Sequence, residues 1–96
     1  MPSQQFSSGD LYIDVQFGDP LNMTVVGEVS LDTAHVFVEA LEAVAAYPGA
    51  PDVAINVVLA RFVGPTDAPL HEAAARARAN GQRFSIISHP HPTAES

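Results

Sequence analysis

The residues best placed to do chemistry lie in the short segment 64–69, which joins an apolar run, 53–59, to an Ala-rich segment, 70–79. The run predicts a strand and the Ala-rich segment a helix, so the hydroxyl of Thr66 lies where strand gives way to helix. The first N–H groups of a helix are unpaired, and with the helix dipole they favour an anion, such as a phosphate on Thr66. A plain alternative is that Thr66, or the neighbouring Asp67, only caps the helix.

The histidines do not predict a metal site. His35 and His71 fall on different predicted helices, and His89 and His91 lie in a Pro-rich stretch without Cys or acid partners at ligand spacing. The chain has no cysteine, and it lacks a Gly-rich phosphate loop, a nucleophile–His–acid arrangement and an obvious pair of carboxylates. We therefore expect no metal, no cofactor and no enzymatic activity.

Acidic residues dominate the first part of the chain. The net charge is −7, and residues 1–60 contain eight of the eleven acids but no arginine or lysine. This charge argues against binding the phosphate backbone of a nucleic acid. No stretch approaches the roughly 20 apolar residues of a membrane span, and the N-terminus lacks the pattern of a signal peptide. We expect a cytoplasmic protein that does not insert into a membrane.

The pattern between residues 11 and 29 predicts a β-hairpin. Apolar and polar side chains alternate over 11–17, and the turn signal at 18–20 separates this strand from a second one, 21–29. Gly27 interrupts the second strand, which indicates a bulge or a close approach of two backbones.

Two further segments have the periodicity of helices. Apolar residues at i, i+3, i+4 spacing predict a helix over Asp32–Tyr47, with Asp32 as its N-cap. We expect Ser30 and Thr33 to help cap this helix and to shape its entry. A second helix, Asp67–Asn80, has a thin apolar stripe of mostly alanines and is followed directly by glycine, a typical C-terminal signal.

Two further predicted strands follow the two helices. The continuous apolar run 53–59 is typical of a parallel strand covered on both faces. In it Ile55 and Val57 should share one face, while Val58 lies on the other. Residues 83–88 form the last predicted strand.

The element order β-β-α-β-α-β predicts an α/β fold. We expect a mixed sheet of about four strands, with an antiparallel edge hairpin and a parallel centre, and two main helices packed on it. Residues 11–88 would form this single domain, between a flexible N-terminal arm, 1–10, and a flexible tail, 89–96.

Three segments in order carry a resemblance to a known family. Residues 27–34 read Gly-Glu-Val-Ser-Leu-Asp-Thr-Ala, residues 57–67 are an apolar strand running into the Thr66 junction, and residues 75–81 are rich in Arg and Ala and end in Gly. These segments resemble the motifs of STAS domains, the sulfate-transporter and anti-sigma-factor-antagonist family, over about Leu21 to Ser88. The resemblance implies a STAS-like fold.

In that family a Ser or Thr at this junction is phosphorylated by a partner kinase, and the unmodified form binds the kinase, which is also the anti-sigma factor. The resemblance places Thr66 at the acceptor position. It implies a non-catalytic, regulatory protein-binding module similar to an anti-sigma factor antagonist, whose partner is an anti-sigma factor and serine-protein kinase or another regulatory protein. The contact surface would include Ser30, Gly64, Thr66, Asp67, His71 and Arg78. The alternative is a STAS-only cytoplasmic subunit of a membrane transporter complex for lipids or anions.

The chain differs from the family pattern near this junction. Ser30, Asn56 and Gly64 stand where the family has acids, and Asp67 stands where it has glycine. The family's final helix also has no counterpart, which would leave part of the sheet or of the helix layer uncovered. A homodimer or a bound partner is the cover we expect.

Overall fold

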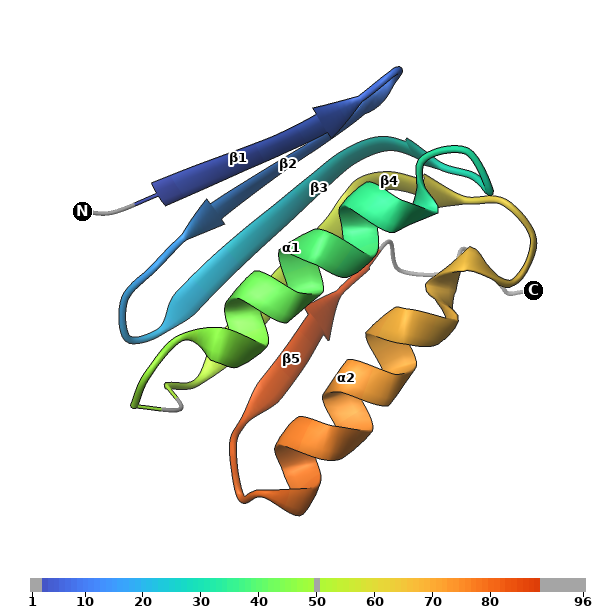
Figure 1. Ribbon diagram of the computed structural model, residues 1–96. Helices are drawn as coiled ribbons and strands as arrows, with labels where there is room; N and C mark the ends of the chain where they lie inside the picture. The colour runs from blue at the N-terminus through green and yellow to red at the C-terminus, as the bar shows by residue number, and fades with distance from the viewer. Residues whose placement is uncertain (1–2, 50, 89–96) are drawn as a thin grey trace.

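The computed structural model describes residues 3–49 and 51–88, which form an α/β fold with five strands and two helices (Figure 1). A short 3₁₀ turn, η1, precedes the second helix. In chain order the elements are β1 (Ser3–Ser8), β2 (Leu11–Gln16), β3 (Leu21–Val29), α1 (Ala34–Ala46), β4 (Val53–Phe62), η1 (Gly64–Asp67), α2 (Ala68–Ala79) and β5 (Phe84–Ile87).

The five strands form one mixed sheet in which they lie in chain order, β1-β2-β3-β4-β5. β1, β2 and β3 are antiparallel, whereas β3, β4 and β5 are parallel, so the predicted β2–β3 hairpin and parallel centre are confirmed. The hairpin is not at the edge, because β1 pairs with β2 along its whole length. The expected flexible arm is therefore wrong for residues 3–8. Residues 89–96, expected to be a flexible tail, lie outside the described residues.

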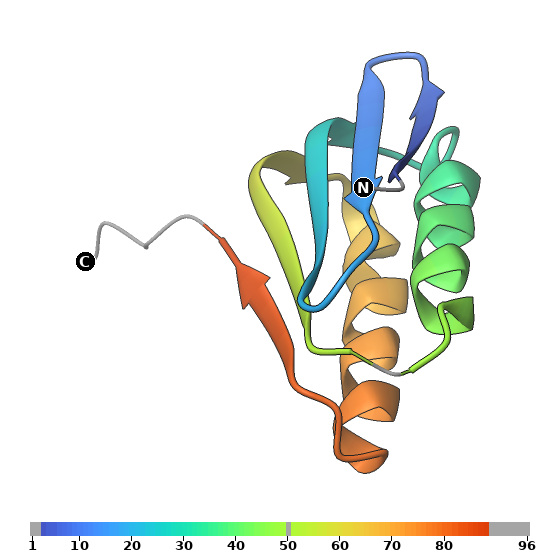
Figure 2. The ribbon, with the colours of Figure 1, turned by 90° about the vertical axis from the view of Figure 1, so that its left-hand side faces the viewer.

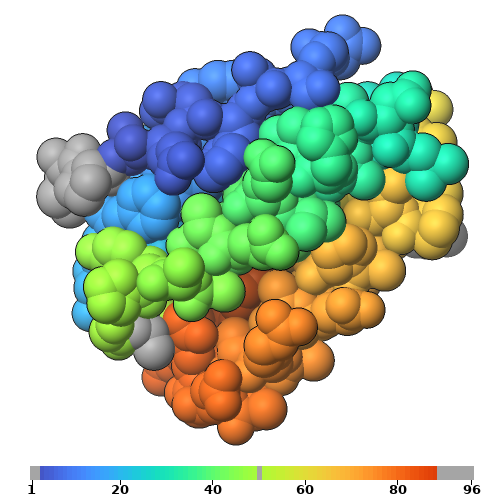
Figure 3. Space-filling model, viewed as in Figure 1, coloured from blue at the N-terminus to red at the C-terminus, as the bar shows by residue number. Residues whose placement is uncertain are grey.

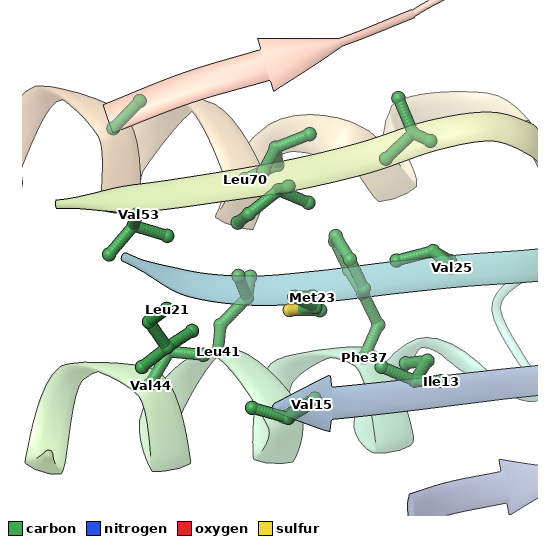
Figure 4. Packing of buried hydrophobic residues seen from close by; sticks show 14 of the residues in the cluster. Ile13, Val15, Leu21, Met23, Val25, Phe37, Leu41, Val44, Val53 and Leu70 are labelled. Carbon is green, nitrogen blue, oxygen red and sulfur yellow. The ribbon is translucent and has the colours of Figure 1, made fainter. Parts of the chain in front are cut away.

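Both helices cover the same face of the sheet (Figure 2). The two β-α-β units step across the sheet in the same direction, and crossovers of the same hand then place their helices on the same side. The core between the layers is built from alternate residues of β2, β3 and β4 and from the inner face of α1, where Phe37 and Leu41 point toward the sheet (Figure 4). No element of the described chain covers the other face, so the expectation that β4 is buried on both faces is wrong.

A bulge in β4 explains why this strand looked continuously apolar. Thr24 of β3 pairs with Asn56, but Val26 pairs with Leu59, so β4 contains one extra residue at this point. The side chain of Asn56 stabilises the bulge, because its Oδ1 accepts a hydrogen bond from the Val58 N–H at 2.9 Å. After the bulge, the alternation of β4 side chains between the two sheet faces is therefore shifted by one residue.

Before the bulge, Ile55 and Val57 are buried against the helices, as predicted, and Val58 lies outside the core cluster. After it, Phe62 packs inward, with its ring edge against Phe37 at a centroid distance of 5.5 Å. Leu59 points to the sheet face opposite the helices and is 66% exposed.

Gly27 lies where two backbones approach closely, as its position in the strand predicted. Its φ is +103°, and a Cβ atom there would collide with the backbone carbonyl of Asp10. This position therefore requires glycine both for conformation and for space.

Candidate functional site

The loops that follow β3 and β4 lie side by side at the carboxyl ends of these parallel strands (Figure 1). The backbone N–H of Val63 donates to the carbonyl of Val29 at 2.9 Å, and the Thr66 hydroxyl donates to the same carbonyl, also at 2.9 Å. We call the surface formed by residues 30–33 and 63–67 the tip. Because both loops are bonded to the end of β3, the tip is fixed to the sheet.

Thr66 anchors the tip and is 4% exposed. Its Oγ1 lies 2.9 Å from the carbonyl oxygen of Val29 and 3.1 Å from that of Val63, and both oxygens are acceptors. Asp67 occupies the N-cap position of α2, but neither η1 nor α2 has a side-chain cap hydrogen bond. Asp67 is therefore the N-cap of α2 by position, as expected, but neither Thr66 nor Asp67 makes the capping hydrogen bond that was expected of them. A kinase reaches the hydroxyl of Thr66 only if η1 first moves away from β3.

The loop before α1 is built around a second buried threonine. Thr33 Oγ1 accepts the Ser30 N–H at 2.9 Å and donates to the Glu28 carbonyl at 3.1 Å. Ser30 and Thr33 therefore shape the entry to the helix, as expected, but neither side chain caps it. The expectation that Asp32 is the N-cap is wrong, because Thr33 holds that position. Thr33 makes no side-chain cap hydrogen bond.

The structure brings together five of the six residues proposed for the contact surface. Gly64 is exposed with a φ of +68°, and Asp67 is joined to His71 on the first turns of α2 by an Oδ2–Nε2 contact of 3.1 Å. Ser30 and Thr66 complete this group on the two loops. Both members of the Asp67–His71 pair are well exposed, so the pair adds little stability and leaves polar groups accessible beside the tip.

Arg78 does not belong to this group. It lies near the other end of α2, and eleven residues of helix separate it from Asp67 by about 16 Å. Its Nη2 donates to the carbonyl of Phe84 at 3.1 Å, so it ties the last turn of α2 to the start of β5. Arg78 was expected to belong to the contact surface, but it lies at the opposite end of α2 from the tip.

Two exposed aliphatic side chains at the tip were not identified from the sequence. Leu31 is 81% exposed between Ser30 and Asp32, and Val63 is 41% exposed just before η1. A leucine between two polar residues at a predicted helix start is the signal that marks Leu31. The hydrogen bonds of Thr33 and Thr66 hold the two loops that carry these side chains.

The helix layer contains a separate concavity of about 340 Å³ between α1 and α2, on the face that Figure 3 shows. Its apolar wall includes Leu41, Val53 and Phe84, and charged side chains such as Glu42 and Arg76 line its margin. None of the tip residues lines it. Among residues 3–49 and 51–88, no group of three His, Cys, Asp or Glu side chains is arranged to hold a metal ion. Within the same part of the chain, no helix is both long and apolar enough to cross a membrane.

The chain matches no known protein-family model, and no curated protein sequence matches it. Its fold is similar to that of two solved crystal structures of Mglu, one of them in its native form. The TM-scores are 0.62 and 0.61, each at 20% identity, over 85% and 79% of this chain. The matched part is 20% and 23% of the respective Mglu chains, so this chain corresponds to about a fifth of their length. These likenesses establish a shared fold.

Proposed function

We propose that this protein is a non-catalytic regulatory module that binds another protein through the tip. The observation that carries the proposal is the exposure of Leu31 and Val63 on two loops that are fixed to the same strand end. Exposed aliphatic side chains on a rigid surface lose little conformational freedom on binding, so more of their burial energy appears as affinity. Ser30 and Asp32 flank Leu31 in its loop, and Asp67 follows Val63 at the end of η1. An apolar centre with a polar rim is the usual composition of a protein interface.

The rim of the tip also indicates the chemistry of the partner. Asp32 and Asp67 contribute two carboxylates to the loops that carry Leu31 and Val63, and the protein as a whole has a net charge of −7. The partner surface is therefore expected to present an apolar pocket bordered by arginine or lysine. The resemblance to STAS domains supports an anti-sigma factor, which is also a serine-protein kinase, or another regulatory protein as the partner.

Binding at the tip does not require phosphorylation of Thr66 in this proposal. The hydroxyl is buried between two carbonyl oxygens, and a phosphate carries about −1.5 to −2 charges, which these oxygens would repel. Thr66 instead holds the binding loops in position. Mass spectrometry of the protein from its native cell tests this point, since stoichiometric phosphate on Thr66 would show that the tip works as a phospho-switch.

The binding experiment compares two substitutions of exposed leucines. The full chain, Leu31→Asp and the matched control Leu59→Asp are used as baits in extract of the native cell, and captured proteins are purified and titrated against each bait. We expect Leu31→Asp to weaken binding of a directly captured protein by about tenfold or more, and Leu59→Asp, on the open sheet face, to leave it unchanged. Equal binding by the wild-type protein and Leu31→Asp would refute the role of the tip.

A further inference from the structure

The sheet face opposite the helices, which we call the open face, has an apolar strip across its strands. The register places Tyr12 beside Val26, and Val26 beside Leu59, so one row crosses β2, β3 and β4. Tyr12 is 45% exposed, and Ile87 on β5, at 46%, extends the apolar surface on the far side of β4. The bulge in β4 contributes to the strip directly, because it turns Leu59 to the open face.

The open face is also poor in charge, although the protein is strongly acidic. Of eleven acidic residues, the strands place two on this face, Asp14 and Glu28. Asp14 accepts a hydrogen bond from Gln5 Nε2 at 2.7 Å, and Glu28 is the register partner of Arg61. Loss of charged residues from an apolar surface is the composition that distinguishes the centre of an interface.

We propose that the open face binds a second copy of this chain, with the two sheets packed face to face. In a two-fold dimer the same surface of both copies forms the contact, so this surface must be complementary to itself. The open face meets this requirement: its centre is uncharged, and Arg61 and Glu28 give each copy both signs of charge for the other. A different partner could complement the acidic character of this protein, but the strands place only Asp14, Glu28 and Arg61 as charged groups on the open face, so it offers such a partner little net charge.

The size of the open face predicts a weak dimer. Five strands spaced by about 4.8 Å, with about six residues of each at 3.3 Å per residue, give a face of about 500 Å². Stable protein interfaces bury about 800 Å² on each partner, so this contact lies at the lower end of the range. We expect a dissociation constant in the micromolar range. This inference does not rest on the proposed function, because Leu31 and Leu59 lie on different surfaces.

Sedimentation equilibrium of the full chain, from micromolar to submillimolar concentration, tests the dimer. We expect the wild-type protein to change from monomer to dimer, and Leu59→Lys to dimerise at least tenfold more weakly. Leu31→Asp is the matched control and should dimerise as the wild type does. Because Leu59 is largely exposed, Leu59→Lys should fold normally, which circular dichroism and thermal unfolding verify.

A second variant tests the same face through its charge. Arg61→Glu removes the positive charge and should also weaken the dimer at least tenfold, with partial recovery at high salt. A wild-type protein that stays monomeric at submillimolar concentration would overturn the proposal. So would undiminished dimerisation of Leu59→Lys, or equal loss of dimer in Leu31→Asp. Equal binding of a captured partner by the wild-type protein and Leu31→Asp, with dimerisation intact, would refute only the proposed function.

Discussion

Replacement of Thr66 by valine removes one hydroxyl and leaves the shape of the side chain nearly unchanged. In the wild-type protein this hydroxyl donates to the carbonyls of Val29 and Val63 in a buried position. Valine fills the same space, so no cavity forms and the change isolates the hydrogen bond. The Val29 carbonyl keeps the Val63 N–H as a donor, which limits the loss.

A hydrogen bond of this kind contributes about 0.5–1.5 kcal/mol, and a buried acceptor that loses its donor costs about 1–3 kcal/mol. Because one of the two carbonyls keeps a donor, we expect Thr66→Val to lower the free energy of unfolding by about 1–2 kcal/mol. For a chain of 96 residues, each kcal/mol lowers Tm by about 4–8 °C.

Urea unfolding followed by circular dichroism measures this change, and the midpoint should fall while the m value stays constant. Thr66→Ser, which keeps the hydroxyl and loses a methyl group, is the control and should be less destabilised than Thr66→Val. Hydrogen exchange should also show faster opening of the amides of residues 63–67 in Thr66→Val. If Thr66→Val is as stable as the wild-type protein, the hydroxyl does not hold the tip to β3 and the reasoning fails.

Two other substitutions test the sheet. Gly27→Ala should lower the free energy of unfolding by more than about 3 kcal/mol, measured by urea unfolding, because its Cβ would meet the Asp10 carbonyl and its φ disfavours any side chain; a loss below 1 kcal/mol would contradict the close approach. Ile55→Ala should cost about 2–5 kcal/mol, since Ile55 is fully buried in β4. Hydrogen exchange of residues 53–58 checks the same strand, and unprotected amides there would contradict its central position.

The parts of the fold that local periodicity encodes could be predicted from the sequence. Alternation over 11–17 predicted β2, and the i, i+3, i+4 spacing predicted α1, with boundaries within two residues of those observed. The glycine signal after the second helix was also informative, because Gly81 has a φ of +78° directly after the C-cap of α2. In each case the signal lies within one element, where side-chain spacing and backbone conformation are directly linked.

The errors arose where backbone pairing between strands, and not side-chain periodicity, decides the structure. β1 is polar, and it is a strand because its backbone pairs with β2 and because Phe6 packs against the core. In β4 the bulge changes the inward phase, and a continuous apolar run gives no sign of a change in phase. The apolar run was therefore interpreted as a strand buried on both faces, although Leu59 is exposed.

The candidate site could be located from the sequence, but its chemistry could not. The Thr66 junction and Ser30 were identified because a hydroxyl between a strand and a helix is a local signal. The hydroxyl of Thr66 bonds to Val29, which is 37 residues away in the chain, and sequence spacing does not show such a contact. Arg78 was grouped with these residues, but it lies in the last turn of α2 and bonds to the carbonyl of Phe84, six residues away, at the start of β5.

The order of the strands in the sheet has a consequence for the growing chain on the ribosome. Because neighbours in the sheet are also neighbours in the sequence, each strand can join a sheet edge that has already been synthesised. β4 is the longest strand, and the outer edge of its first four residues, 53–56, is unpaired until β5 emerges. Synthesis from Phe62 to Phe84 takes about 1–4 s at about 5–20 residues per second. During that interval the apolar edge of β4 can pair with a strand from another nascent chain. The four residues of β5 therefore cover the first part of this edge, whereas residues 57–62 of β4 have no strand on that side within the described part of the chain.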